Sequence, residues 1–462
     1  MPSNSVALTP GLASFLKSLK TNPIETSIDN LVSLLKRRQI RLSRSCAIAT
    51  AYLLLRVVSA FRTTDAAKLI ERVQSVGRRL MAAQPRELVV GNIVRRVLGL
   101  IRDEAEDDRD AEFSLASEAG SDSRPHTPHG VESHSPSRSH GGPDEHTLPV
   151  HDKDILSLRH EGSERSSSRP PLSSFASAQA PPVIGMFSLL QHPEAESPQP
   201  SSPGTASPSG RFQAHGQHKD IRAEVLDGIH EIIDELGQVD DQIAGYALEH
   251  IHSNEVILTH TSSSTVQKFL LKAAAKRKFT VIHAESYPNN HEATHARVSG
   301  NTEGDEENMS TESFQKPLIA LGITVILIPD SAVFAIMSRV NKVILGTHSV
   351  LANGGLVAAA GTRVIARAAK VHQTPVVVVS GIYKLSPVYP FDYESLIEHG
   401  DPSKVIGYED GDLVDKIDVE NPLYDYVPAE LVDLYITNLG GHAPSYLYRI
   451  VSDHYRKEDI TF

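Results

Sequence analysis

Polar side chains follow a series of short apolar runs in the second half of the chain, and these are the residues that could carry chemistry. The runs span residues 256–259, 279–284, 323–328, 342–345 and 375–380. We expect parallel strands, and ligands of parallel α/β sheets bind at the carboxyl ends of the strands. Imidazole and carboxylate groups gathered there could transfer protons. The candidate pocket contains Thr261, His283, Glu285, Asp330, Thr347, His348 and Asn353.

A second candidate is a short metal motif. His291 and His295 stand four residues apart with Glu292 beside the first, which is the spacing of zinc proteases. Such a site needs a helix and a third ligand, and no later His or Glu has an obvious spacing. We therefore interpret the motif as the start of a solvated helix and expect no metal and no cofactor.

Phosphate-binding loops are the third possibility. The chain has no Gly-four-residues-Gly-Lys-Ser/Thr sequence, so we do not expect it to bind GTP as a P-loop protein does. The glycines after Asn353, at 354 and 355, do not form a dinucleotide fingerprint. We expect them to turn the chain into the next helix.

Two basic runs could bind an acidic surface. The first contains Lys36, Arg37, Arg38, Arg41 and Arg44, and the second contains Lys272, Lys276, Arg277 and Lys278. The second run is at the C-terminus of an expected helix, where cations complement the helix dipole. We interpret both runs as solvated faces, with docking to an acidic protein or a nucleic-acid backbone as the alternatives.

The elements that position these groups fall into two types. Helical periodicity fills the first part of the chain, with Leu69, Val73, Val76 and Leu80 on one face, and it resumes after residue 220. From residue 254, Val- and Ile-rich runs alternate with helical stretches, which predicts βαβ units and a parallel sheet. We expect the tail, 427–455, to return to helices.

One long segment resembles neither type. Residues 111–210 hold 22 Ser and 14 of the chain's 28 Pro. Such a segment buries too little apolar surface to offset the entropy of ordering, so we expect it to be disordered and dispensable for folding. We predict a helical domain over 1–110 and 216–252, interrupted by this insertion at 111–215. An α/β domain follows over 253–462, with an acidic loop at 299–313.

Composition excludes several classes of protein. The net charge of −12 argues against a dedicated nucleic-acid binder. The single cysteine, Cys46, excludes an internal disulfide, and its apolar neighbours indicate a packing role. The N-terminus has no basic start or apolar core typical of a signal peptide, and no uncharged run is long enough to span a membrane. We expect a cytosolic protein.

Several segments are similar to one known family. They are residues 87–98, 247–256, 334–343, 384–387, 426–432 and 440–446. They resemble the regulatory subunits (alpha, beta and delta) of translation initiation factor 2B, and the beta type in particular. The resemblance implies an N-terminal helical domain and a Rossmann-like domain that dimerises. It also implies a decamer with alpha, delta, gamma and epsilon subunits that exchanges nucleotide on translation initiation factor 2 and senses phosphorylation of that factor's alpha subunit.

The same fold resembles isomerases that interconvert methylthioribose and methylthioribulose phosphates. Compared with their motifs, His348 and Gly355 replace two Asp residues, and Ala358 and Ala359 stand where Asn and Lys are expected. Thr261 takes the place of a Cys. Proton transfer needs an acid and a base, and the phosphate needs a cation. We therefore expect a scaffold without the enzyme's chemistry.

The resemblance also suggests where partners bind. The final segment is apolar, and we predict a partner interface there formed by Leu431, Leu434, Tyr446, Leu447 and Ile450. Two alternatives stay open at this point, namely a sugar-phosphate isomerase and a helical protein associated with nucleic acid.

Overall fold

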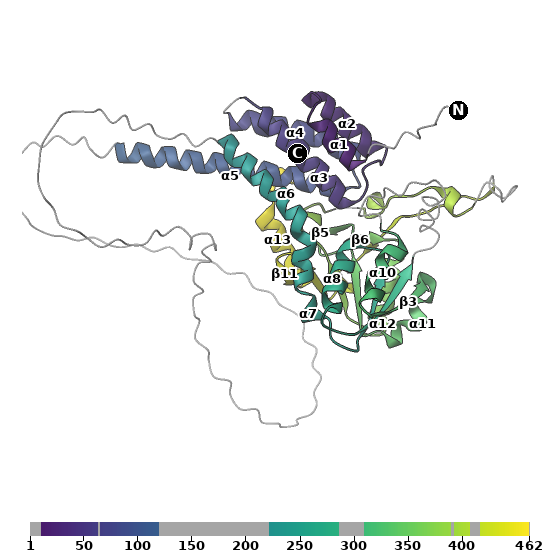
Figure 1. Cartoon of the computed structure of the whole chain (residues 1–462). Helices are drawn as coiled ribbons and strands as arrows, with labels where there is room; N and C mark the ends of the chain where they lie inside the picture. Colours follow the sequence, from purple (N-terminus) through teal and green to yellow (C-terminus); the bar gives the residue numbers. More distant parts are fainter. Residues whose placement is uncertain are drawn as a thin grey trace, which may run out of the picture. The chain divides into compact units, whose positions relative to one another are not determined.

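The computed structural model describes residues 11–62, 65–119, 221–285, 309–389, 392–406 and 416–461 (Figure 1). The His291–His295 motif, the acidic loop up to residue 308 and the insertion from residue 120 lie outside these residues. Helices form the first part of the described chain: α1 (Leu12–Leu19), α2 (Ile24–Lys36), α3 (Ser43–Ala60), α4 (Ala66–Ala83), α5 (Leu88–Ala119), α6 (Ile221–Gly245) and α7 (Ala247–His250).

Apolar periodicity explains the packing of these helices. Leu69, Val73, Val76 and Leu80 of α4 are buried, as predicted. Asp65 begins α4 by accepting hydrogen bonds from the backbone amides of Ala67 and Lys68 at 3.0 and 3.4 Å. Helices α5 and α6 contact each other and α3, so the segments on either side of the insertion share one core. Helix α5 continues to Ala119, past the predicted start of the insertion.

A seven-stranded sheet forms the second part, in the order β11-β10-β7-β4-β1-β2-β3. All its pairs are parallel except β10 with β11. The strands are β1 (Val256–His260), β2 (Thr280–Glu285), β3 (Thr324–Pro329), β4 (Lys342–Gly346), β7 (Val376–Val379), β10 (Leu434–Thr437) and β11 (Gly440–His442). The predicted α plus α/β fold with a Rossmann-like parallel sheet is confirmed.

Helices cover both faces of this sheet (Figure 1). Strand β7 shows how the sheet divides the core, because Val377 and Val379 face one cluster and Val376 and Val378 face the other. The first cluster includes α8 (Ser264–Ala274), α10 (Thr311–Ala320) and the N-terminal helices. The second includes α11 (Val333–Ile336), α12 (Thr362–Val371) and α13 (Leu447–His454).

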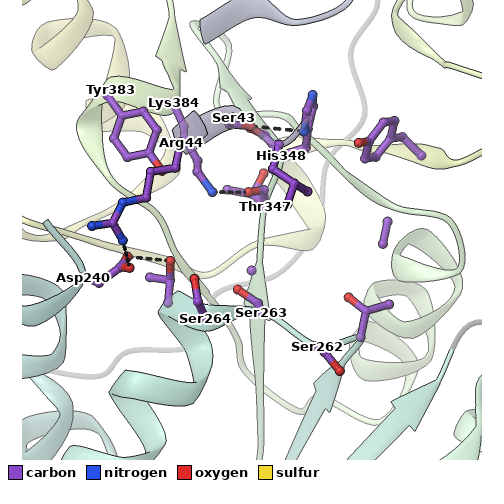
Figure 2. A pocket seen from close by; sticks show the side chains of 16 residues that line it. Ser43, Arg44, Asp240, Ser262, Ser263, Ser264, Thr347, His348, Tyr383 and Lys384 are labelled. Carbon is purple, nitrogen blue, oxygen red and sulfur yellow. Dashed lines mark hydrogen bonds and ion pairs between the residues drawn. The ribbon is translucent and has the colours of Figure 1, made fainter. Parts of the chain in front are cut away.

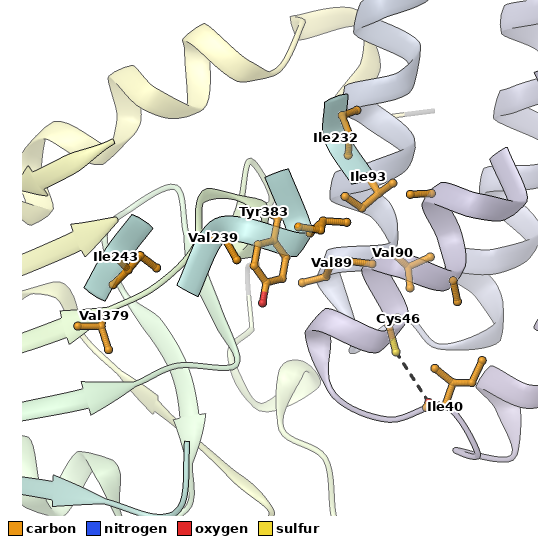
Figure 3. Close-up of a cluster of buried hydrophobic side chains, with 14 of the residues drawn as sticks. Ile40, Cys46, Val89, Val90, Ile93, Ile232, Val239, Ile243, Val379 and Tyr383 are labelled. Atoms are coloured by element: carbon orange, nitrogen blue, oxygen red, sulfur yellow. Dashed lines mark hydrogen bonds between the residues drawn. The ribbon is translucent and has the colours of Figure 1, made fainter. Parts of the chain in front are cut away.

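The first cluster joins the helical part to the sheet. Figure 3 shows Cys46, Val90 and Ile93 from the helices in one group with Tyr383 and Val379 from the α/β part. The amide of Asn92 on α5 donates a 3.0 Å hydrogen bond to the carbonyl of Tyr383. Cys46 is fully buried, as its packing role predicts. The two parts therefore share a continuous hydrophobic core.

Two predictions about local structure are wrong. The tail forms β9 (Tyr424–Val427), β10 and β11 before the α-helix α13. Residues 434–436 of β10 pair with β7, and the β-branched Ile436 and Thr437 favour the strand. Asn353 does not lead into a helix. It lies in the turn between β5 (Ser349–Leu351) and β6 (Leu356–Ala359), where Gly354 has a φ of +79° that favours glycine.

Those two strands belong to a second, smaller sheet. Its order is β8-β5-β6-β9, with β8 spanning Leu385–Ser386. A Cβ at Gly354 would lie 2.8 Å from the carbonyl oxygen of Pro444, so the turn packs closely on the segment before α13. The small sheet therefore brings the β5–β6 turn into contact with the C-terminal tail.

Candidate functional site

A cavity of about 150 Å³ lies where the carboxyl ends of β1 and β4 meet the start of α3 (Figure 2). The loop after β1 contributes hydroxyl groups at residues 261–265. The loop after β4, helix α6 and the segment before β8 close the other sides. The lining residues are Leu42, Ser43, Arg44, Asp240, Thr261, Ser262, Ser263, Ser264, Thr265, Gly346, Thr347, His348, Ala359, Tyr383, Lys384 and Tyr424.

The cavity brings together three of the seven residues predicted for the pocket. Thr261, Thr347 and His348 line it. Thr261 has a φ of +55°, which places it at the sharp turn that ends β1. The other four predicted residues lie elsewhere, because the predicted strand ends are spread over a wide sheet and a separate turn.

His283 and Glu285 lie on β2, outside the cavity. The His283 ring packs on Phe314 with centroids 4.5 Å apart, and its Nδ1 is 3.0 Å from Nε2 of Gln315. Glu285 accepts a hydrogen bond from the hydroxyl of Thr311. Both side chains therefore hold α10 against β2.

Asp330 and Asn353 also lie outside the cavity, where they contact neighbouring loops and side chains. A Cβ at Gly361 would come within 3.2 Å of both Asp330 Oδ2 and His260 Nε2, so Asp330 lies beside the start of α12. The Asn353 amide donates to the hydroxyls of Tyr393 and Tyr426 at 3.3 and 3.2 Å.

His348 connects the cavity to the helical part. Its Nδ1 lies 3.1 Å from the Ser43 hydroxyl, and that hydroxyl donates a 2.8 Å bond to the His348 carbonyl. On the other side, Nε2 is 3.4 Å from a Glu87 carboxylate oxygen, and the ring stacks on Tyr424 at 4.4 Å. Burial lowers the pKa of His348 to about 3, and the charges of Lys384 and Arg38 act in the same direction. The Glu87 carboxylate acts in the opposite direction.

Arg44 and Asp240 form an ion pair that the sequence did not indicate. Arg44 Nη1 is 2.6 Å from Asp240 Oδ2, and the Thr265 hydroxyl donates to Asp240 Oδ1 at 2.7 Å. A second member of the same basic run, Arg38, pairs with Glu398. The interpretation of this run as a solvated face is therefore wrong for these two arginines. Their carboxylate partners are far away in the chain, so the sequence pattern could not identify them.

Lys384 is a second functional group that sequence reasoning missed. Its Nζ donates a 3.0 Å hydrogen bond to the Thr347 carbonyl at the cavity wall. The resemblance to the isomerases places a cation only at Ala359, whereas Lys384 and Arg44 both line the cavity. In the sequence, Lys384 stands out only as the first residue of the family segment 384–387.

The chemistry available in the cavity is limited by these contacts. Asp240 is the only carboxylate among the described residues that line it, and Arg44 and Thr265 occupy both its oxygens. His348 bridges to Ser43 and Glu87. Cations and hydroxyls could hold a small anion, but no lining carboxylate or thiol is placed to exchange a proton with it. Within the described ranges, no group of His, Cys, Asp or Glu is arranged to bind a metal ion.

The predicted partner interface is mostly internal packing. Leu431, Leu447 and Ile450 are buried in the second core cluster, and Leu434 packs against the first. Only Tyr446 is substantially exposed, at 47%. A periodic apolar tail indicates burial, but it does not say whether the tail is buried within its own chain or against a partner.

Apolar side chains are exposed instead at the opposite edge of the sheet. We define the β3 edge patch as the exposed side chains of Ile319, Leu321, Ile326, Leu327 and Phe334. β3 pairs only with β2 among the described strands, so no described strand covers its outer edge. Sequence alone predicted a strand here and could not show that it is an edge strand. No helix in the described part of the chain is long and apolar enough to cross a membrane.

Comparison with known proteins adds to this geometry. The model of a family described as the initiation factor 2 subunit family matches residues 39–304 and 306–444. The chain is 39% identical over 439 residues to translation initiation factor eIF2B subunit beta of Schizosaccharomyces pombe, covering 94% of this chain and 96% of that protein.

Two solved structures are similar over nearly the whole chain. The crystal structure of eIF2B beta from Chaetomium thermophilum is 30% identical, covers 98% of each chain and has a TM-score of 0.60. A chain in the tetrameric eIF2B-beta2-delta2 complex from C. thermophilum is 31% identical, with 96% of this chain and 100% of that chain covered and a TM-score of 0.59.

Proposed function

The chain belongs to the initiation factor 2 subunit family, and from this premise we propose that it is a non-catalytic regulatory subunit, of the beta type, of the guanine-nucleotide exchange factor for translation initiation factor 2. In this proposal it supports the complex as a scaffold and senses phosphorylation of the factor's alpha subunit. Its partners are the alpha, delta, gamma and epsilon subunits and translation initiation factor 2 itself, and it acts in the cytosol.

The state of the strand-end cavity supports the non-catalytic role. His348 stacks on Tyr424 and contacts Ser43 and Glu87, which belong to the helical part. Asp240 is neutralised by Arg44. His348 takes the place of an Asp in the isomerase motif that the sequence resembles. Here the contacts of His348 with Ser43 and of Asp240 with Arg44 hold the start of α3 in place. This favours a subunit whose helical part and α/β part form one rigid unit.

The β3 edge patch supports a role in assembly. A long apolar edge strand presents unpaired backbone groups together with apolar side chains, which favours pairing with another chain. The similar chain from C. thermophilum crystallised in a tetrameric eIF2B-beta2-delta2 complex. We therefore assign the contact with the delta subunit to this patch.

Co-expression tests the proposal directly. Native mass spectrometry of the purified complex is expected to show this chain with the four other subunits. Nucleotide exchange on initiation factor 2 is expected to be inhibited by phosphorylated factor only when this chain is present. An exchange complex that assembles and responds to phosphorylation without the chain would refute the role.

The isomerase alternative has its own test. The isolated chain is expected to show no isomerisation of sugar phosphates, because Thr261 cannot replace a thiol acid and His348 is held by Ser43. Turnover that is abolished by Thr261→Ala or by His348→Ala would establish an enzyme and overturn the non-catalytic reading.

A further inference from the structure

A groove of about 630 Å³ lies on the helical part, away from the strand-end cavity. Three helices form it: the C-terminal half of α1, the last turns of α3 and the first turns of α6, which are seen together in Figure 1. The lining residues are Leu16, Leu19, Lys20, Tyr52, Leu55, Arg56, Ser59, Leu226 and His230. Its floor is therefore apolar, and leucines on three separate helices contribute to it.

The charges around this floor have one sign. Lys20, Arg56 and His230 are basic, and none of the described residues that line the groove is acidic. The whole chain carries a net charge of −12, so a groove with only basic groups differs from the average surface. A partner with carboxylates would be attracted to this position and repelled by much of the remaining surface.

Arg56 places a positive charge in the wall of the groove. Its Nη2 donates to the Asn22 carbonyl, which fixes the position of the guanidinium. No acidic residue is among the described residues that line the groove, so a carboxylate seated there would be attracted to this charge.

The length of the groove fits a helix. Residues 52, 55, 56 and 59 of α3 follow one another along one helical face. They span about two turns, roughly 10 Å along the helix axis. A helix laid into such a groove uses apolar anchors at positions i, i+3, i+4 and i+7.

We propose that this groove, which has no part in the exchange-factor role assigned above, binds an acidic amphipathic helix of a partner protein. The leucine anchors of that helix occupy the floor formed by Leu16, Leu55 and Leu226. Its flanking carboxylates pair with Lys20 and His230 and are attracted to the positive charge of Arg56.

A pair of synthetic peptides tests the charge requirement on the full chain in its complex. The first probe is acetyl-Glu-Glu-Leu-Ala-Ala-Leu-Leu-Ala-Glu-Leu-Glu-Glu-amide, and the second has Lys in place of every Glu. The acidic probe is expected to bind at least tenfold more tightly, measured by fluorescence anisotropy. Equal affinity of the two probes, or no binding of the acidic one, would overturn the proposal.

A charge reversal at the rim locates the binding site. The double variant Lys20→Glu with His230→Glu changes two exposed side chains, so the thermal unfolding midpoint is expected to stay within a few degrees of wild type. Affinity for the acidic probe is expected to fall at least tenfold, and affinity for the Lys probe to rise. An unchanged preference would show that the acidic probe binds elsewhere.

Photo-crosslinking identifies the natural occupant. Tyr52 in the groove is replaced by p-benzoylphenylalanine in the assembled complex, and Tyr448, an exposed tyrosine on α13, is replaced in the same way as a control. Mass spectrometry is expected to find a Tyr52-specific crosslink to an acidic amphipathic helix of another chain. A crosslink to a segment of this same chain, a crosslink to a basic segment, or the absence of any Tyr52-specific crosslink would refute the proposal.

Discussion

The two edges of the main sheet are built in opposite ways. At one edge, β11 is only three residues long and Gly-rich, and the chain continues into α13, whose Leu447 and Ile450 are buried in the core. At the other edge, β3 is six residues long and apolar, and its Leu327 is 55% exposed. Natural proteins blunt edges that must not pair with other chains. The difference supports our proposal that assembly involves β3, and the burial of Leu447 and Ile450 shows that the apolar tail packs within the fold.

The largest expected effect comes from truncation at Asn438. This change removes the buried side chains of Leu447, Ile450, Val451 and Tyr455, and each buried apolar side chain contributes about 1.5–3 kcal/mol. Their sum is comparable with the total stability of a domain, which is on the order of 5–15 kcal/mol. We expect the truncated chain to lose its cooperative unfolding transition in calorimetry. If it folds normally and fails only to bind delta, the tail is an interface after all.

The next expected effect concerns the segment that holds the tail. Arg102 forms paired contacts of 2.9–3.2 Å with the carboxylate of Asp459, which is fully buried, and Arg95 donates to the carbonyls of Asp459 and Ile460. Asp459→Asn leaves Arg102 without its counter-charge and is expected to lower the free energy of unfolding by about 3 kcal/mol. Denaturant titration measures this change, with the exposed neighbour Glu458→Gln as control. Equal effects of the two changes would mean that the Arg102–Asp459 ion pair does not stabilise the packing of the tail.

A buried histidine on β1 predicts that the stability of the fold depends on pH. Burial lowers the pKa of His260 on β1 to about 4, and the nearby His283 on β2 acts in the same direction. In the unfolded chain the imidazole titrates near 6.5, so the unfolded state binds a proton first as the pH falls. The part of the stability that depends on His260 should therefore decrease between about pH 6.5 and pH 4, by on the order of 3 kcal/mol, and His348, whose pKa is lowered to about 3, should add to the decrease. His260→Asn should reduce the slope of the curve in this range in denaturant titrations at several pH values. An unchanged slope would exclude His260 as its source.

A matched pair of variants tests the comparison of the two edges most directly. We expect these variants to have the smallest effect on stability. Leu327 beside β2 and Leu439 beside β11 are 55% and 56% exposed. Leu327→Asp and Leu439→Asp should each change the free energy of unfolding by less than about 0.5 kcal/mol. We expect only Leu327→Asp to weaken association with delta, at least tenfold by analytical ultracentrifugation. Weakening by Leu439→Asp alone would reverse the assignment of the two edges.

Element type was largely predictable from the sequence. The 3.6-residue period of Val73, Val76 and Leu80 predicted helix α4, and the Val-rich run at 376–379 predicted strand β7. The error in the tail has a physical cause. Apolar residues around 431–439 fit a helix or a strand equally well, and pairing of β10 with β7 decided between them.

The candidate site was less predictable because its contacts are long-range. The sequence located Thr261, Thr347 and His348 from their positions after strands, since the side of the sheet on which a parallel strand ends is fixed by its direction. Arg44 with Asp240, Lys384 with Thr347, and Ser43 with His348 join residues far apart in the chain.

Local sequence therefore determined which segments are helices or strands, that the sheet is parallel and which family the chain resembles. These properties depend on side chains a few residues apart, which the sequence lists in order. Strand order, edge position and ion pairing depend on how distant segments meet. Whether Leu327 is exposed and Leu447 buried was decided only when β3 became an outer strand and α13 packed on the core. The reason is that burial is a property of the assembled tertiary structure and not of the residue type.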